Sequence, residues 1–172
     1  MQHVIITLPQ NLWEAILSGK KLFEIRKVIP RIAPFSGRVY VCLKGSDTVV
    51  GFFTLSAIVG SDDAKYIWEI CAGNIAVTKE WFMKYAANKT KYIFAWEIDS
   101  VDKFMVPCNR FTEFGIKGNP QSFVYTQTEP TIATELVRGI KHNEAFLSKN
   151  QVMPISIFYQ ETWFDNIPTK NK

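Results

Sequence analysis

Apolar residues recur along the chain with two different spacings, which predict short strands and short helices. Runs with strand-like composition occupy residues 3–8, 20–28, 38–43, 49–59 and 91–99. Helical spacing occupies residues 11–18, the stretch from Ser61 or Asp62 to Gly73, and the stretch that begins at Thr78. Because most of these helices fall between strands, the sequence favours an α+β fold with a mixed, partly closed sheet over a doubly wound parallel sheet.

Some details of these elements follow from individual residues. The fourth strand is expected to bulge near Gly51, and residues 105–107 are expected to form a short edge strand because they include a proline. In the third helix, the side that carries Trp81, Phe82 and Tyr85 is expected to be buried.

The last fifty residues differ in pattern from the rest. Apolar residues at Ile132, Leu136, Ile140 and Phe146 predict an amphipathic helix over residues 131–147. Residues 153–158 are expected to add a strand and residues 167–172 to form a disordered tail. We therefore expect one barrel-like domain over residues 1–125, and an extension over residues 126–166 that packs on the same domain.

The composition fits one compact domain and narrows the choice of partners. The chain has 172 residues, of which 47% are hydrophobic and 14% aromatic, as expected for a β-rich core. A net charge of +4 permits a polyanionic partner without requiring one. The N-terminus does not resemble a signal peptide and no apolar run is long enough to cross a bilayer, so we expect a cytoplasmic protein without a membrane partner.

Cysteine and histidine are too sparse for a metal centre. Cys42, Cys71 and Cys108 lie far apart and form no C-x-x-C pair, and the only histidines are His3 and His142. The odd number of cysteines fits a reducing compartment. We expect no metal site and no cofactor.

The strongest candidate for chemistry is the charged stretch of residues 20–27. Strand alternation places Glu24 and Arg26 on one face, opposite Phe23, and Lys21 reaches that face only if the preceding turn redirects it. In the plain interpretation this face is exposed and the Glu–Arg pair contributes about 0–1 kcal/mol. In the functional interpretation it is the floor of a polar cleft, where Arg26 binds a phosphate or a base edge and Glu24 orients it or accepts a proton.

Two further segments offer polar groups. In residues 114–123, Gly115 and Gly118 would allow close approach of the backbone, and Gln121 and Ser122 carry groups suited to a base edge. The alternative is an ordinary polar loop. Asn74 lies between two predicted helices, where it either reaches the cleft or serves as a turn residue.

These segments together resemble the ASCH domain family of the PUA-like superfamily. Gly19, Lys21, Glu24 and Arg26 match its G-x-K-x-x-E-x-R signature, and residues 119–123 resemble its closing P-P-Q-S-F segment, with Asn119 in place of the first proline. The resemblance covers about residues 3–125. It implies a small β-barrel surrounded by helices, with a cleft beside the signature and a role in RNA binding or RNA metabolism.

Some members of this family resemble amidohydrolases that act on N4-acetylcytidine, and others are described as ribonucleases. The amidohydrolase branch uses a lysine, a threonine and a later glutamate. The lysine corresponds to Lys21, the threonine position holds Glu24, and the later glutamate falls near Asn74, with Glu69 as the alternative. The resemblance therefore does not supply the alcohol that this mechanism needs.

Three functional hypotheses remain open on the sequence. The first is a module that binds RNA or a nucleobase, and its candidate contacts are Lys20, Lys21, Glu24, Arg26, Lys27, Gln121, Ser122, Asn74 and, for stacking, Trp68 or Phe123. The second is a hydrolase in which Lys21 and Glu24 are catalytic. The third is a regulator that binds a small metabolite, or a protein through the C-terminal helix.

Overall fold

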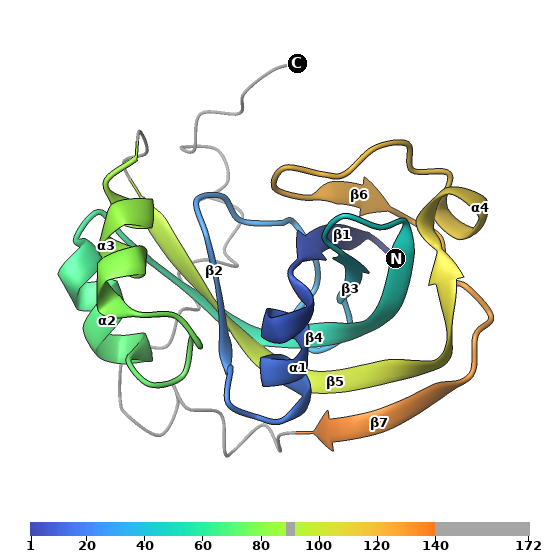
Figure 1. The fold of residues 1–172 in the computed structure, drawn as a ribbon, viewed down its shortest axis with the longest axis horizontal. Helices are drawn as coiled ribbons and strands as arrows, with labels where there is room; N and C mark the ends of the chain where they lie inside the picture. The colour runs from blue at the N-terminus through green and yellow to red at the C-terminus, as the bar shows by residue number, and fades with distance from the viewer. Residues whose placement is uncertain (89–91, 140–172) are drawn as a thin grey trace.

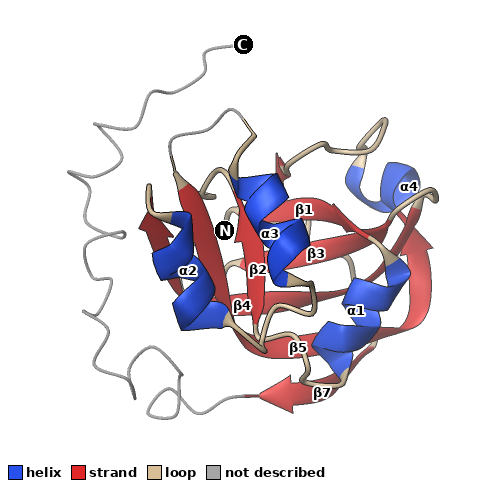
Figure 2. Ribbon diagram, turned by 60° about the vertical axis from the view of Figure 1, so that its left-hand side comes forward, coloured by secondary structure: helices blue, strands red, loops and turns tan. Residues whose placement is uncertain are grey.

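The computed structural model describes residues 1–88 and 92–139, which form a sheet with short helices around it (Figures 1 and 2). The elements in chain order are β1 (His3–Leu8), α1 (Gln10–Leu17), β2 (Phe23–Arg26), β3 (Arg38–Leu43), β4 (Thr48–Ser61), α2 (Ala64–Cys71), α3 (Lys79–Ala86), β5 (Ile93–Asn109), α4 (Arg110–Phe114), β6 (Val124–Thr126) and β7 (Thr134–Gly139). The predicted α+β class is confirmed.

The seven strands form one mixed sheet that stays open. Its strand order is β2-β5-β4-β3-β1-β6, and β7 pairs with a further part of β5. β1 and β3 are parallel, whereas the other pairs are antiparallel. β2 and β6 stand at the two ends of this order, so the described strands make a curved sheet rather than the closed barrel that the resemblance implies.

Alternate residues of the central strands contribute their side chains to two different hydrophobic clusters. Val4 and Ile6 of β1 belong to the larger cluster, which also holds the buried faces of α1, α2 and α3. Ile5 of β1 and Tyr40 of β3 belong to the smaller cluster, next to Phe114 of α4. Because successive side chains of a strand point to opposite faces, the two clusters cover opposite faces of the sheet.

The bulge predicted near Gly51 is confirmed, and the sterics at this residue explain it. The pairing of β4 with both neighbours changes register beside Gly51. A Cβ atom at this position would lie 2.3 Å from the backbone oxygen of Asp102 and 3.0 Å from Trp13. Only glycine therefore allows β4 and β5 to approach so closely here.

The helices differ from the prediction in their N-cap residues and in which side chains are exposed. The N-cap of α2 is Asp63, not Ser61 or Asp62, and α1 begins after Pro9 without a side-chain cap. Thr78 caps α3 as expected, but Trp81 on that helix is 49% exposed rather than buried.

The C-terminal helix is the clearest error of the prediction among the described residues. Residues 134–139 form the strand β7, which pairs with residues 100–104 of β5, and Leu136 is 63% exposed. Ile132, Leu136 and Ile140 are spaced by four, a spacing that fits both a helix and one face of a strand. The rest of the predicted helix, the strand at 153–158 and the tail lie outside the described residues.

The end of β5 also differs from the prediction. The expected edge strand at 105–107 is the continuation of β5 itself, which runs to Asn109. The unpredicted helix α4 follows at once, capped by the Asn109 side chain and closed by Gly115 in the left-handed conformation. The short strand β6 begins at Val124, after the loop that follows α4.

Candidate functional site

A buried ion cluster formed by Lys21, Glu24 and Arg26 lies on β2 and the turn before it. Glu24 Oε2 is 3.1 Å from Lys21 Nζ, and Glu24 Oε1 is 2.8 Å from Arg26 Nε. Lys21 is 2% exposed and Glu24 is 4% exposed. The turn therefore does redirect Lys21 toward Glu24, and the plain interpretation of an exposed strand face is wrong.

Lys21 is committed to the protein interior. Its ammonium donates to the backbone oxygens of Phe23 at 2.7 Å and Ile75 at 3.2 Å, besides its ion pair with Glu24. Two of its three N–H donors are thus satisfied by backbone oxygens, and Glu24 Oε2 lies nearby as an ion-pair partner. In this arrangement Lys21 fixes the turn after α1 and holds the Glu24 carboxylate in place.

Arg26 connects the two ends of the open sheet. From β2, at one end of the strand order, its guanidinium donates to the backbone oxygen of Thr7 in β1 and to that of Ser122 just before β6, each at 3.3 Å. Its side chain is 11% exposed. We refer to this junction of Arg26, Thr7 and Ser122 as the Arg26 seam.

A cavity of about 330 Å³ opens beside the Arg26 seam. Its lining residues are Thr7, Pro9, Lys44, Asn119, Pro120 and Gln121. Lys44 and Gln121 are exposed, and Lys44 is tied to β1 by a backbone hydrogen bond to Leu8 at 2.8 Å. The cavity thus brings the predicted residue Gln121 together with Lys44, which the sequence analysis did not single out.

Arg110 holds the two walls of this cavity. It is 5% exposed and contacts the side chains of Asp47, in the turn that contains Lys44, and Asn119, in the segment that contains Gln121. An arginine at the start of a helix carries no signal of such a role in a single sequence. Gly115 and Gly118 adopt φ angles of 67° and 79°, and no protein atom lies within 4 Å of a Cβ placed there.

The other predicted contacts lie apart from the cavity or act through their backbone. The Asn74 backbone oxygen accepts from Leu22 and Phe23, and its side chain reaches only the Ala72 oxygen at 3.5 Å, as expected for a turn residue. Trp68 packs on Phe82 with ring centroids 5.5 Å apart. These side chains support the fold and do not face the Arg26 seam.

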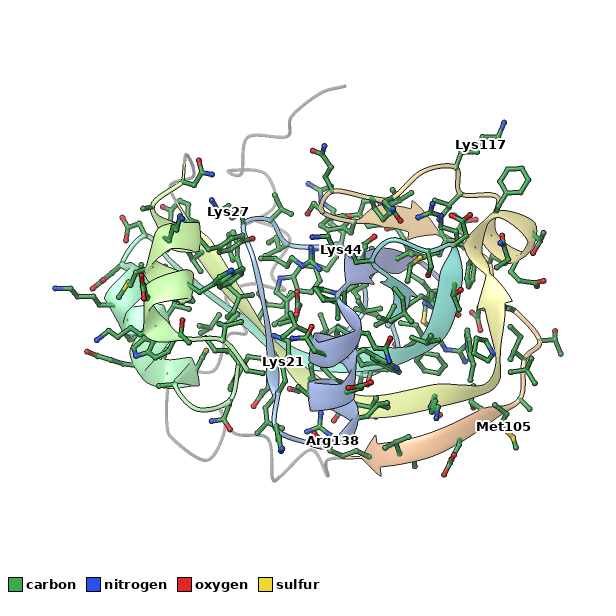
Figure 3. All side chains as sticks on the ribbon, in the orientation of Figure 1. Lys21, Lys27, Lys44, Met105, Lys117 and Arg138 are labelled. Carbon is green, nitrogen blue, oxygen red and sulfur yellow. The ribbon has the colours of Figure 1, made fainter. Side chains whose placement is uncertain are left out.

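The remaining cations and aromatics lie on the flanks. Lys20 is exposed, and Lys27 donates to the Asn88 backbone oxygen, with its Nζ 4.7 Å from the centre of the Tyr85 ring. Phe123 follows Ser122 and packs 6.1 Å from Trp96, centroid to centroid. Figure 3 shows Lys27 near the upper end of β2 and Lys21 lower in the view, toward the other end of the same strand.

The three charged side chains of the ion cluster lie next to the buried thiol of Cys71. Lys21 and Arg26 contribute two positive charges and Glu24 one negative charge, so the cluster carries a net charge of +1. Burial raises the pKa of the neighbouring Cys71 thiol to about 12, although Lys21 acts to lower it. Cys71 therefore stays a neutral thiol beside the cluster.

Two classes of site find no support in the part of the chain that the structure describes. No group of three or more histidine, cysteine, aspartate or glutamate side chains there is placed to hold a metal ion. No helix in that part has both the length and the apolar character required to cross a membrane.

Comparison with known proteins identifies the fold. No protein-family model matches this sequence, and no curated protein matches it. The crystal structure of ASCH from Zymomonas mobilis is similar, with 25% identity and a TM-score of 0.63 over 73% of this chain and 87% of the other. A tyrosine-to-phenylalanine variant of that protein gives 24% and 0.64 over 73% and 90%, and a serine-to-alanine variant gives 22% and 0.63 over 73% and 88%. The resemblance found in the sequence is confirmed, and this chain has the ASCH-domain fold.

Proposed function

We propose that this protein is an RNA- or nucleobase-binding module whose ligand occupies the cavity beside the Arg26 seam. The observation that carries the proposal is the position of Arg26, a nearly buried guanidinium at the junction of three segments, next to a cavity with Lys44 and Gln121 in its wall. The ASCH fold and its association with RNA support the same ligand class.

Arg26 does not line the cavity, but it borders it through its hydrogen bond to Thr7, and we propose that it contacts the ligand there. Its two terminal nitrogens each donate one N–H to a backbone oxygen, of Ser122 and of Thr7, and its Nε lies 2.8 Å from Glu24 Oε1 as an ion pair. Each terminal nitrogen carries a second N–H, for which no partner lies among the described residues. These remaining N–H groups can donate to the oxygens of a phosphate or to the edge of a base. The ion pair with Glu24 fixes the orientation of the guanidinium.

The cavity wall adds both charge and hydrogen-bonding capacity. Lys44 supplies an exposed cation for a phosphate, and the exposed Gln121 amide both donates and accepts, as reading a base edge requires. Thr7 Oγ1 is buried in this wall and has no hydrogen-bond partner among the described residues.

The hydrolase hypothesis receives less support from the same geometry. Lys21 and Glu24 would be its catalytic residues, yet the Lys21 ammonium donates to two backbone oxygens and pairs with Glu24, and both residues are almost fully buried. A nucleophile or general base needs a path to its substrate. A titration with labelled RNA would also reveal cleavage of the RNA, which is the result that a ribonuclease predicts.

The proposal is tested by titrating a labelled single-stranded RNA of about twelve nucleotides with the protein at low and moderate salt. We expect binding that weakens with salt by about 0.7 logarithmic units of affinity per tenfold rise in salt for each neutralised phosphate. Lys44→Ala should weaken binding and reduce this slope by about one contact. Lys117→Ala is the matched control, since Lys117 is exposed on the loop after α4 (Figure 3).

The outcomes separate the hypotheses. Binding that depends on Lys44 and not on Lys117, with the RNA intact, supports the module. Shortened RNA moves the assignment to a ribonuclease. If neither binding nor cleavage occurs, RNA is the wrong ligand, and the same titration with a free nucleoside tests the smaller ligand class.

A further inference from the structure

An exposed pair of stacked aromatic rings lies on α3. Trp81 and Tyr85 are four residues apart on the helix, with ring centroids 5.2 Å apart and ring planes inclined by only 8°. Tyr85 packs against the main hydrophobic cluster, whereas Trp81 is 49% exposed. Tyr85 thus supports the indole from the protein side, and the exposed surface of Trp81 is left for a further ring.

This pair adjoins the Arg26 seam. Lys27, the residue after Arg26, places its Nζ 4.7 Å from the centre of the Tyr85 ring. The pKa of the Tyr85 hydroxyl is raised chiefly by burial, while the charge of Arg26 lowers it and that of Glu24 raises it, so the phenol lies within electrostatic range of the ion cluster. Figures 1 and 2 both show α3 alongside β2.

We infer that Trp81 stacks on an unpaired base of the RNA, so that the module takes single-stranded rather than duplex RNA. This inference rests on the proposed function of the Arg26 seam. Arg26 and Lys27 are consecutive residues, and Lys27 lies between the seam and the stacked rings. A strand with a phosphate at Lys27 therefore brings one of its bases to the indole. Stacking on an aromatic side chain is indifferent to base identity, because every base has an apolar face.

The same arrangement discriminates against a duplex. In a helix of RNA both faces of an interior base are covered by its neighbours, so an indole gains contact only with unstacked bases. The cations near the seam attract either form of RNA through its phosphates. Trp81 is therefore expected to set the preference for a single strand, and the cations to set the overall affinity.

The test compares Trp81→Ala with Phe111→Ala, which removes an exposed aromatic ring from α4 at the other end of the molecule (Figure 1). Both proteins are titrated with a labelled oligouridylate, with a duplex of equal length, and with an abasic strand of equal length. We expect Trp81→Ala to weaken oligouridylate binding by about 5- to 150-fold, the effect of one stacked base. Its affinity for the duplex and for the abasic strand should match that of the unchanged protein, as should every affinity of Phe111→Ala.

A second variant guards against a loss of folding. Trp81→Phe keeps an aromatic ring on the helix, so it should retain most of the affinity. Because this variant lacks the indole, oligouridylate should no longer cause the part of the tryptophan fluorescence quenching that arises from Trp81. If oligouridylate binds through Lys44 but Trp81→Ala binds it equally well, the stacking inference is overturned and the proposed function stands. If the unchanged protein binds none of the three ligands, the proposed function itself fails.

Discussion

The guanidinium of Arg26 donates to the backbone oxygen of Ser122 at 3.3 Å, which joins residues 96 positions apart in the sequence. Through this bond and its partner at Thr7, one side chain spans the open side of the sheet. The same side chain is the proposed ligand contact. Substitutions at Arg26 should therefore affect binding and stability together, and the two effects have to be measured separately.

Arg26→Lys preserves the charge and removes the fork of N–H donors. A lysine ammonium is a point charge that cannot reach the Glu24 carboxylate and both backbone oxygens with the same geometry. We expect the affinity for single-stranded RNA to fall by about tenfold or more, the effect of losing one charge-assisted contact. Titration under conditions where circular dichroism shows a folded protein checks this. An unchanged affinity would mean that Arg26 serves only to join the sheet ends.

Glu24→Gln tests the buried ion cluster. The amide has nearly the same size but leaves Lys21 and Arg26 as two buried cations without a counter-charge. Removing one partner of a buried ion pair typically costs about 3–5 kcal/mol of unfolding free energy. Urea denaturation measures the loss, and Glu69→Gln on the exposed side of α2 is the control, expected to change stability by less than about 0.5 kcal/mol. Equal stability of the two variants would contradict a structural role for the cluster.

Gly51→Ala tests the close approach of β4 and β5. The new methyl group would lie 2.3 Å from the Asp102 backbone oxygen and 3.0 Å from the Trp13 ring, so the strands must separate or shift register. We expect thermal unfolding to indicate a loss of about 1–3 kcal/mol, the usual cost of overpacking. Gly139→Ala provides the comparison, because a Cβ there meets nothing within 4 Å. The prediction is wrong if both substitutions have the same effect.

The three cysteines should differ in reactivity toward an alkylating reagent. Burial raises the pKa of Cys71 to about 12, and the pKa of Cys108, which is partly exposed, is raised to about 11. Only the thiolate reacts, and a raised pKa shifts its formation to higher pH. At a pH of about 8, below both of these pKa values and close to that of a free thiol, we expect negligible labelling of folded Cys71, and Cys108 should react before Cys71 as the pH rises. Mass spectrometry of digested protein checks the order, and labelling in urea should reach all three.

The sequence was informative wherever local pattern and tertiary structure agree. The strand over residues 3–8 and the Thr78 cap depend on local alternation and capping, and both are found as predicted. The placement of Glu24 and Arg26 on a common face followed from the same alternation. The candidate-site residues that the sequence identified are those flanked in the sequence by clear helix or strand patterns.

Features that depend on distant partners leave no local pattern in the sequence. Strand β7 forms because β5 has a free edge at residues 100–104, and nothing within residues 131–139 records that edge. The roles of Lys44 and Arg110 arise because the turn after β3 meets the segment before β6, which no spacing in the sequence reveals. Trp81 was expected in the core because helical spacing identifies a side of a helix and does not measure how far the core extends.

Because the Arg26 seam joins distant parts of the sequence, it can form only late in the synthesis of the chain. Among the described strands β2 pairs only with β5, and Arg26 finds its last acceptor at Ser122, so both wait until most of the described chain has left the ribosome. Until then the charged face of β2 stays in water, where its ions carry no desolvation penalty. The proposed binding site is thus among the last parts of the described chain to form, and a ligand that needs it can be bound only after β1, β2, β5 and the segment before β6 have come together.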